Sequence, residues 1–143
     1  MSTIIGTTLN ADTIRKTGGS LGTDIRIKNT SVYESDGGTS VTQNLVQGLI
    51  KVWHHGSLDG TTLEDSFNVG SMTDTGTGRQ TVNLTNNMAN VNYAPQTGVH
   101  FGQSRFLFIE NMATSSYQST TYNSNDNGYT DAHQNSQVTG DLA

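Results

Sequence analysis

Apolar and polar residues alternate in short runs along the chain after Gly48. Glycine, asparagine or aspartate interrupts these runs every few residues, as in antiparallel strands that have one face in a core and the other in solvent. The pattern predicts an all-β fold, an antiparallel β-sandwich of roughly seven to eight short strands over residues 48–143. The expected strands are residues 49–53, 63–69, 91–94, 106–110 and 115–124, together with a hairpin ending at residue 85.

That hairpin is the segment SFNVGSMTDTGTGRQTVNLT, residues 66–85. Its glycine-rich centre predicts a tight turn, and strand-forming residues flank the turn on both sides. The apolar residues of its second strand fall on one face, and the threonine and asparagine residues fall on the other. A turn centred on residues 76–77 gives two expected cross-strand pairs, Val69 with Leu84 and Asp74 with Arg79.

The supply of apolar side chains for a core is small. Hydrophobic residues make up 31% of the 143-residue chain, against about 45–50% in ordinary globular proteins. We therefore expect copies of the chain to associate and to share buried surface. The residues expected in the core are Trp53, Phe67, Val82, Leu84, Phe106 and Phe108.

The N-terminal region has a different pattern. Residues 1–38 contain few apolar side chains and a glycine-rich stretch, which predicts an attachment arm that becomes ordered against a partner. Residues 39–47 fit either a two-turn helix or an extended connector. Such a short helix needs packing partners, so Val41, Leu45 and Leu49 are expected to meet their copies about a threefold axis.

Charge and composition exclude several function classes. The net charge is −5 and the seven basic residues are scattered, so we expect no binding to nucleic acid. Cysteine is absent, which rules out disulfides and thiolate metal sites. The first residues do not form a signal peptide, and no segment has the roughly 20 apolar residues of a membrane span. We expect a chain that is made in the host cytoplasm and is not inserted into a membrane.

Motifs for catalysis or cofactor binding are missing. The sequence has neither a GxxxxGK[ST] phosphate loop nor a GxSxG nucleophile elbow, so we expect no enzymatic activity and no cofactor. His54 and His55 are neighbours on an expected strand and point to opposite faces, so both cannot bind one ion in one chain. A threefold axis could gather copies of one of them. His100 and His133 have no companion in the sequence, and no metal site is predicted.

Four blocks carry a resemblance to a known family: TSVTQNLVQGLIKVW, DSFNVGSMTDTGTGRQTVNLT, NMANVNYA and the ending VTGDLA. Together they resemble the recurrent C-terminal domain of tail-fibre-like and virion structural proteins of tailed bacteriophages, particularly those that infect marine cyanobacteria. The hairpin is the most specific part. The chain departs from the family pattern at residues 53–56 and in the apolar insertion of residues 99–112. The resemblance implies a trimeric, host-facing virion protein.

Pattern and resemblance together predict a non-enzymatic virion protein, a short homotrimeric tail fibre or fibre-like appendage that displays a β-sandwich. The arm of residues 1–38 would bind other virion proteins, and the loop NDNGYTDAHQ would contact host surface glycan. The alternative is a capsid or tail decoration protein, a cement, without a receptor role. Expected receptor contacts are Asn127, Tyr129 and His133, and expected oligomer contacts are Val41, Leu45, Leu49, Phe106 and Phe108.

Overall fold

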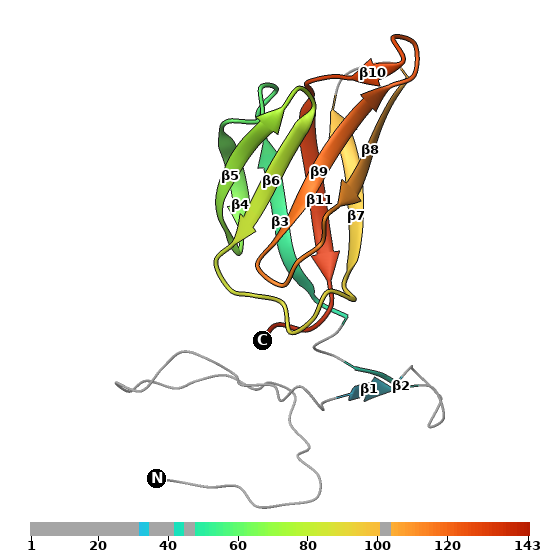
Figure 1. Ribbon diagram of the computed structural model, residues 1–143. Helices are drawn as coiled ribbons and strands as arrows, with labels where there is room; N and C mark the ends of the chain where they lie inside the picture. The colour runs from blue at the N-terminus through green and yellow to red at the C-terminus, as the bar shows by residue number, and fades with distance from the viewer. Residues whose placement is uncertain (1–31, 35–41, 45–47, 101–103) are drawn as a thin grey trace, which may run out of the picture.

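The computed structural model describes residues 32–34, 42–44, 48–100 and 104–143. Every regular element in these ranges is a β-strand (Figure 1). A separate pair consists of β1 (Val32–Glu34) and β2 (Thr42–Asn44). The remaining strands are β3 (Ile50–Gly56), β4 (Leu63–Phe67), β5 (Val69–Gly76), β6 (Arg79–Leu84), β7 (Ala94–His100), β8 (Arg105–Glu110), β9 (Ser116–Asn123), β10 (Gly128–Tyr129) and β11 (His133–Thr139).

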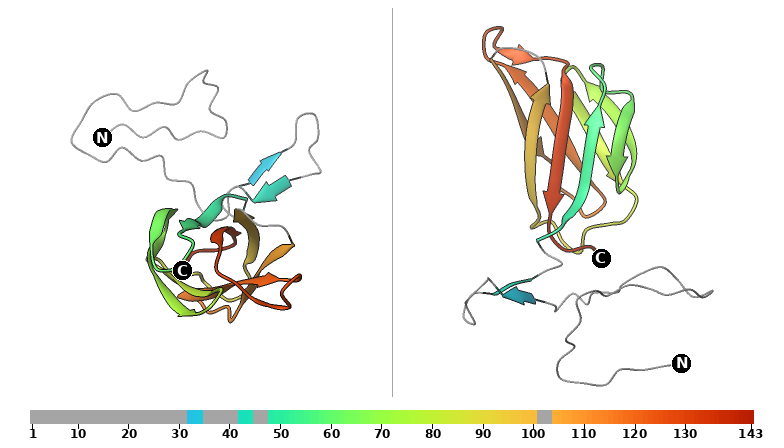
Figure 2. Two further views of the ribbon diagram at one scale, coloured as in Figure 1. Left: turned by 90° about the horizontal axis from the view of Figure 1, so that it is seen from above. Right: turned by 180° about the vertical axis from the view of Figure 1, so that it is seen from behind.

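Two antiparallel sheets pack face to face, which confirms the predicted all-β sandwich (Figures 1 and 2). One sheet has the strand order β4-β3-β11-β7. In the other, β5 pairs with β6 and β6 with β9, while β8 pairs with the opposite edge of β9 and β10 pairs with its end.

The two layers also meet at both lateral edges. Asn68, with a φ of 59°, separates β4 from β5 and carries the chain from one sheet to the other. At the opposite edge β7 lies beside β8, where the Thr97 hydroxyl donates a hydrogen bond of 2.9 Å to the carbonyl oxygen of Leu107. Both edges of the sandwich are therefore covered within one chain.

The predicted hairpin is β5 and β6. Val69 lies opposite Leu84 as expected, but two register shifts in β5 move the turn by one residue. Asp74 therefore faces Gln80 instead of Arg79, and the turn residues are Thr77 and Gly78. The prediction assumed an uninterrupted ladder, and the bulges break it.

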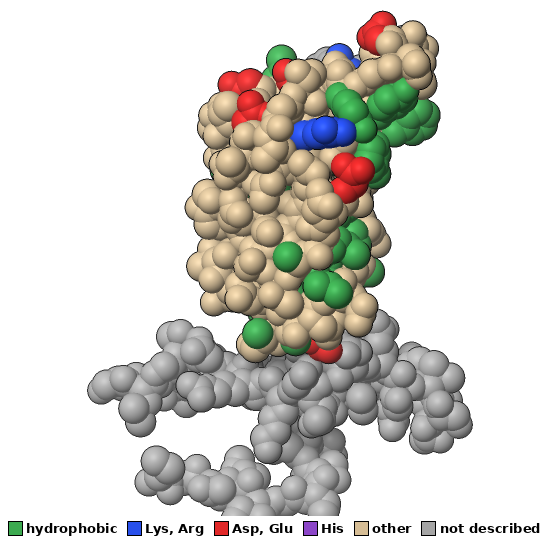
Figure 3. All heavy atoms as spheres, in the orientation of Figure 1, with side chains coloured by type: hydrophobic (Ala, Val, Ile, Leu, Met, Phe, Trp, Pro, Cys, Tyr) green, Lys and Arg blue, Asp and Glu red, His purple; other side chains and the backbone are tan. Residues whose placement is uncertain are grey.

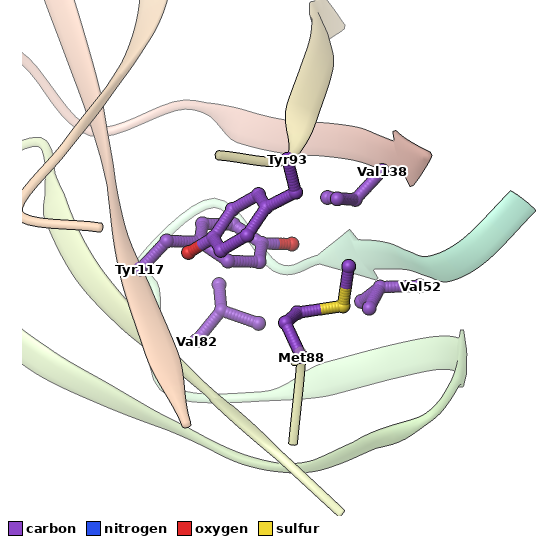
Figure 4. Packing of buried hydrophobic residues seen from close by; sticks show 6 residues of the cluster. All are labelled: Val52, Val82, Met88, Tyr93, Tyr117 and Val138. Atoms are coloured by element: carbon purple, nitrogen blue, oxygen red, sulfur yellow. The ribbon is translucent and has the colours of Figure 1, made fainter. Parts of the chain in front are cut away.

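The apolar core is small and lies toward the end of the sandwich that holds the C terminus (Figures 1 and 4). Side chains from the two sheets point toward one another there, and the ring centroids of Tyr93 and Tyr117 are 6.4 Å apart. The buried cluster consists of Val52, Val82, Met88, Tyr93, Tyr117 and Val138, with Leu84 packed against it.

Most of the large side chains expected in the core lie elsewhere. Phe67 is 53% exposed and Phe106 is 59% exposed, while Trp53 and Phe108 are half-buried. The cause is the pleat of the strands: Val52 faces inward, so its neighbour Trp53 faces outward. The expectation was correct for Val82 and wrong for Phe67 and Phe106.

The other half of the interior is polar. Gln80, Ser119 and Gln134 are each at most 2% exposed. Ser119 and Gln134 hydrogen-bond to each other, and the Gln134 amide donates to the carbonyl oxygen of Gly78 at 3.2 Å. Amide and hydroxyl groups thus fill space that apolar residues fill in most sandwiches, which fits the low apolar content.

The structure also corrects the strand expected at residues 91–94 and decides part of the segment 39–47. The strand expected at residues 91–94 begins only at Ala94 and continues through Pro95, which an edge strand such as β7 tolerates. Within residues 39–47, Thr42–Asn44 is a strand paired with β1, so the extended alternative holds there and the helix does not. The rest of that segment, including Val41 and Leu45, lies outside the described residues, as does most of the arm.

Candidate binding groove and histidine cluster

The outer face of the β4-β3-β11-β7 sheet presents two rows of residues. Each row takes one residue from each of the neighbouring strands β3, β11 and β7. In one row Trp53 of β3 lies beside Gln137 of β11, which lies beside Gln96 of β7. In the next row His55 lies beside Asn135 and then Gly98. The pairing fixes this order because side chains of the same face repeat every second residue along each strand.

These rows border an open groove of about 460 Å³. Gly98 leaves the groove open, because a Cβ atom at this position would have no heavy atom within 4 Å. Trp53 supplies an aromatic wall, and the three amides of the rows supply polar groups. The lining residues are Trp53, His54, His55, Gln96, Thr97, Gly98, Asn135, Ser136 and Gln137.

The groove combines a flat apolar ring with fixed hydrogen-bonding groups. The Gln137 side chain donates to the Gln96 side-chain oxygen at 2.6 Å, which holds both amides in place. Each carboxamide has two donor hydrogens and an acceptor with two lone pairs, so both retain capacity for a ligand. An aromatic surface beside several amides suits a ligand that has apolar C–H faces and many hydroxyl groups.

A histidine cluster lies next to the second row, where His55 approaches Glu64 of β4 and the directly paired residues His133 and His100. Glu64 is 3.3 Å from Nε2 of His55 and 3.7 Å from Nδ1 of His133. The His100 ring centroid is 6.0 Å from that of His133 and 6.5 Å from that of His55. Four strands therefore bring together three histidines and one carboxylate.

His54 points the other way, into the sandwich. Its Nδ1 is 2.9 Å from the Ser136 hydroxyl and 3.2 Å from the Tyr117 hydroxyl. Burial lowers the pKa of His54 to about 4, and the nearby His55 adds a smaller effect in the same direction. Burial likewise raises the pKa of Tyr117 to about 12. The serine–histidine contact is internal, and within the described residues Nε2 of His54 has no hydrogen-bond partner.

The expected receptor residues do not form one surface. Asn127 accepts a hydrogen bond of 2.5 Å from the Tyr122 hydroxyl, and Tyr129 packs against Tyr122 and under Arg79, whose Cζ is 3.8 Å from the Tyr129 ring centre. This group belongs to the β9 and β10 side of the molecule. His133 belongs to the other sheet and to the histidine cluster.

The expected oligomer contacts in the described residues lie on the surface. Leu49 is 52% exposed, and Phe106 faces outward beside Tyr122. Hydrophobic side chains gather over β8 and β10 next to a basic side chain (Figure 3). We call Phe106, Phe108, Tyr122 and Tyr129 the aromatic patch.

Sequence reasoning missed the groove amides and the histidine cluster. One signal was present: His133, Asn135 and Gln137 alternate in one segment, and Gln96, Gly98 and His100 alternate in reverse order in another. Antiparallel pairing of these two segments joins the residues into the observed rows. The local pattern could not show that the segments are partners.

Comparisons with protein-family models, with curated proteins and with solved structures found no match for this chain. In the part of the chain that the structure describes, no helix is long and apolar enough to span a membrane.

Proposed function

We propose that the chain is a non-enzymatic virion protein, a short trimeric appendage of a tailed phage, whose sandwich binds host surface glycan in the Trp53 groove. The observation that carries this proposal is the groove itself, in which an aromatic wall faces amides held on rigid strands. A sugar ring can stack its C–H face on the indole and hydrogen-bond its hydroxyls to the amides. The virion setting rests on the resemblance of the sequence blocks.

A binding role suits the groove better than catalysis. Glycoside cleavage needs two carboxyl groups on either side of the scissile bond. Among the described residues that line the groove, none carries a carboxylate. Glu64 lies nearby but is engaged with His55 and His133.

The test is solution calorimetry of the purified protein against a panel of neutral and acidic bacterial surface polysaccharides. Two variants probe the groove: Trp53→Ala removes its wall, and Gly98→Val places a branched side chain in it, at a position where a Cβ atom meets no heavy atom within 4 Å. We expect each to weaken binding at least about tenfold, since loss of a central tryptophan typically costs about 2 kcal/mol or more. The control, Tyr129→Ala, should bind as the wild type does.

Two results would contradict the proposal. One is that no polysaccharide of the panel binds at millimolar sugar concentration. The other is that Tyr129→Ala abolishes binding while both groove variants retain it, which would move the receptor site to the β9–β10 end. Circular dichroism of each variant checks that the sandwich is intact. Release of reducing ends from a bound polysaccharide would contradict the non-enzymatic part.

A second candidate, the cement protein, is favoured by the aromatic patch on the opposite sheet. Phe106 and Tyr129 are 59% and 43% exposed, and large exposed apolar patches commonly mark protein contacts. A cement would lose incorporation into particles when Phe106 is replaced by Asp, and the groove variants would leave both incorporation and adsorption unchanged. Counting incorporated copies and adsorbed particles separates the two functions.

A further inference from the structure

The histidine cluster draws one ligand-type side chain from each strand of its sheet. Glu64 belongs to β4, His55 to β3, His133 to β11 and His100 to β7. The ligand atoms of Glu64, His55 and His133 all lie within 4.8 Å of one another. Residues this far apart in the sequence converge only because the four strands are neighbours in the sheet.

We propose that His55, His133 and Glu64 bind one divalent transition-metal ion, Zn²⁺ being the best match, at the edge of the groove. Two ligands that are each about 2.0–2.1 Å from zinc at a tetrahedral angle are separated by about 3.3 Å. The separation of His55 Nε2 from the nearer Glu64 oxygen is 3.3 Å. The His133 nitrogen is 3.7 Å from the other oxygen and within 4.8 Å of the remaining ligand atoms, so the side chains must close around the ion.

The ring nitrogens are also placed for coordination. His55 Nε2 and His133 Nδ1 are buried atoms that make no hydrogen bond within the described residues, although both face the Glu64 carboxylate. The side chains are between 28% and 40% exposed, so an ion can reach them from solution. A cation between these groups would satisfy both nitrogens and the carboxylate together.

His100 is the natural fourth ligand. Its ring lies beside both other imidazoles, and its strand pairs His100 directly with His133. Three imidazoles and one carboxylate suit zinc, copper or nickel, whereas calcium and magnesium prefer sites made only of oxygen ligands. An ion held this way would tie β4, β3, β11 and β7 together across their outer face.

The experiment uses full-length, tag-free protein that has been freed of metal with a chelator and dialysed. Calorimetric titration with ZnCl₂ should show one ion per chain, and zinc should raise the thermal midpoint because it binds the folded state. Co²⁺ should give the strong visible d–d absorption of a tetrahedral site. His55→Ala, His133→Ala and Glu64→Gln should each weaken zinc binding at least about tenfold. Glu110→Gln, a carboxylate change on the other sheet, is the matched control and should bind zinc as the wild type does.

The proposal fails if the wild type binds no zinc at 100-fold molar excess, or if binding survives all three substitutions. It also fails if the stoichiometry is one ion per three chains, since that would place the ion on a symmetry axis between copies. Thermal midpoints of the metal-free variants establish that they fold. The glycan titrations are carried out without metal. Failure of the zinc proposal therefore leaves the glycan proposal untouched, and the reverse also holds.

Discussion

At the scale of single residues, His54 makes stability depend on pH. Its pKa is about 4 in the folded protein and 6.5 when exposed, and Tyr117 and Ser136, which contact it, stay neutral in this range. Between these pH values the unfolded chain therefore binds a proton that the folded chain does not. The stabilising contribution is complete above pH 6.5 and declines as the pH falls toward 4, by up to about 3 kcal/mol.

Urea unfolding of metal-free protein at pH 7.0, 5.5 and 4.5 measures this effect. His54→Gln removes the titrating group, so the difference between wild type and variant isolates it from the carboxylates. We expect the wild type to lose more stability than the variant over this range. Parallel pH profiles for the two proteins would show that His54 does not titrate as described.

Gly78 is a second residue with a specific role. Its φ is +69°, and a Cβ atom there would lie 2.7 Å from backbone atoms of Thr121 and Thr130. Its amide donates to Asp131 at 2.6 Å, and its carbonyl oxygen accepts from the Thr121 amide at 2.7 Å. We expect Gly78→Ala to lower the free energy of unfolding by at least about 2 kcal/mol, from the unfavourable φ and the backbone contacts.

Gly98→Ala is the control for that substitution, because Gly98 has open space around it and no positive φ. It should change the free energy of unfolding by less than about 1 kcal/mol. Equal losses in the two variants, measured by chemical denaturation, would contradict the role assigned to Gly78.

Sequence reasoning at the residue scale failed where it had to choose a face. Alternation in β3 shows that Val52 and Trp53 lie on opposite faces but does not say which residue is buried. The larger apolar side chain, Trp53, was expected inside, whereas Val52 is the buried residue. The close-packed interior at this point already holds Tyr93 and Tyr117 beside Val52, and the tryptophan lies on the outer face. The partners of His54 are 63 and 82 residues away, beyond any local pattern.

At the scale of elements, most strand positions were predictable, but β11 was not expected as a strand and β7 was expected at residues 91–94. The partners of distant strands were not predictable. The β5–β6 hairpin was predicted because its turn chemistry is local. The pairings of β3 with β11 and of β11 with β7 join distant segments, and together with the β3–β4 pairing they create the groove and the histidine cluster. Both candidate sites are therefore products of topology.

The N-terminal elements form a unit of their own, since β1 pairs with β2 and with no sandwich strand in the described residues. We expect a chain that begins at Thr39 to unfold cooperatively with an unchanged thermal midpoint, because the buried cluster runs from Val52 to Val138. The same chain should fail to join particles. Loss of cooperative unfolding, or normal incorporation, would contradict the division between arm and sandwich.

At the scale of the whole molecule, the small core and the aromatic patch indicate association of copies, and with the resemblance of the sequence blocks they lead us to predict a homotrimer. Light scattering should give about three times the chain mass of 15.3 kDa. Phe106→Asp places a charge in the aromatic patch and should yield monomers, because burying an unpaired charge is costly. A wild-type monomer at micromolar concentration would refute the prediction, and a trimeric Phe106→Asp variant would exclude the patch as the interface.

The outer face of the β4-β3-β11-β7 sheet is the proposed binding surface. The most direct test is a series of ¹H–¹⁵N correlation spectra of metal-free protein during titration with the polysaccharide that binds best. We expect one set of signals to shift together and to saturate: the Trp53 indole, the side-chain amides of Gln96, Asn135 and Gln137, and the Gly98 backbone amide. Shifts confined to β8, β9 and β10, with the Trp53 signal unchanged, would contradict this expectation.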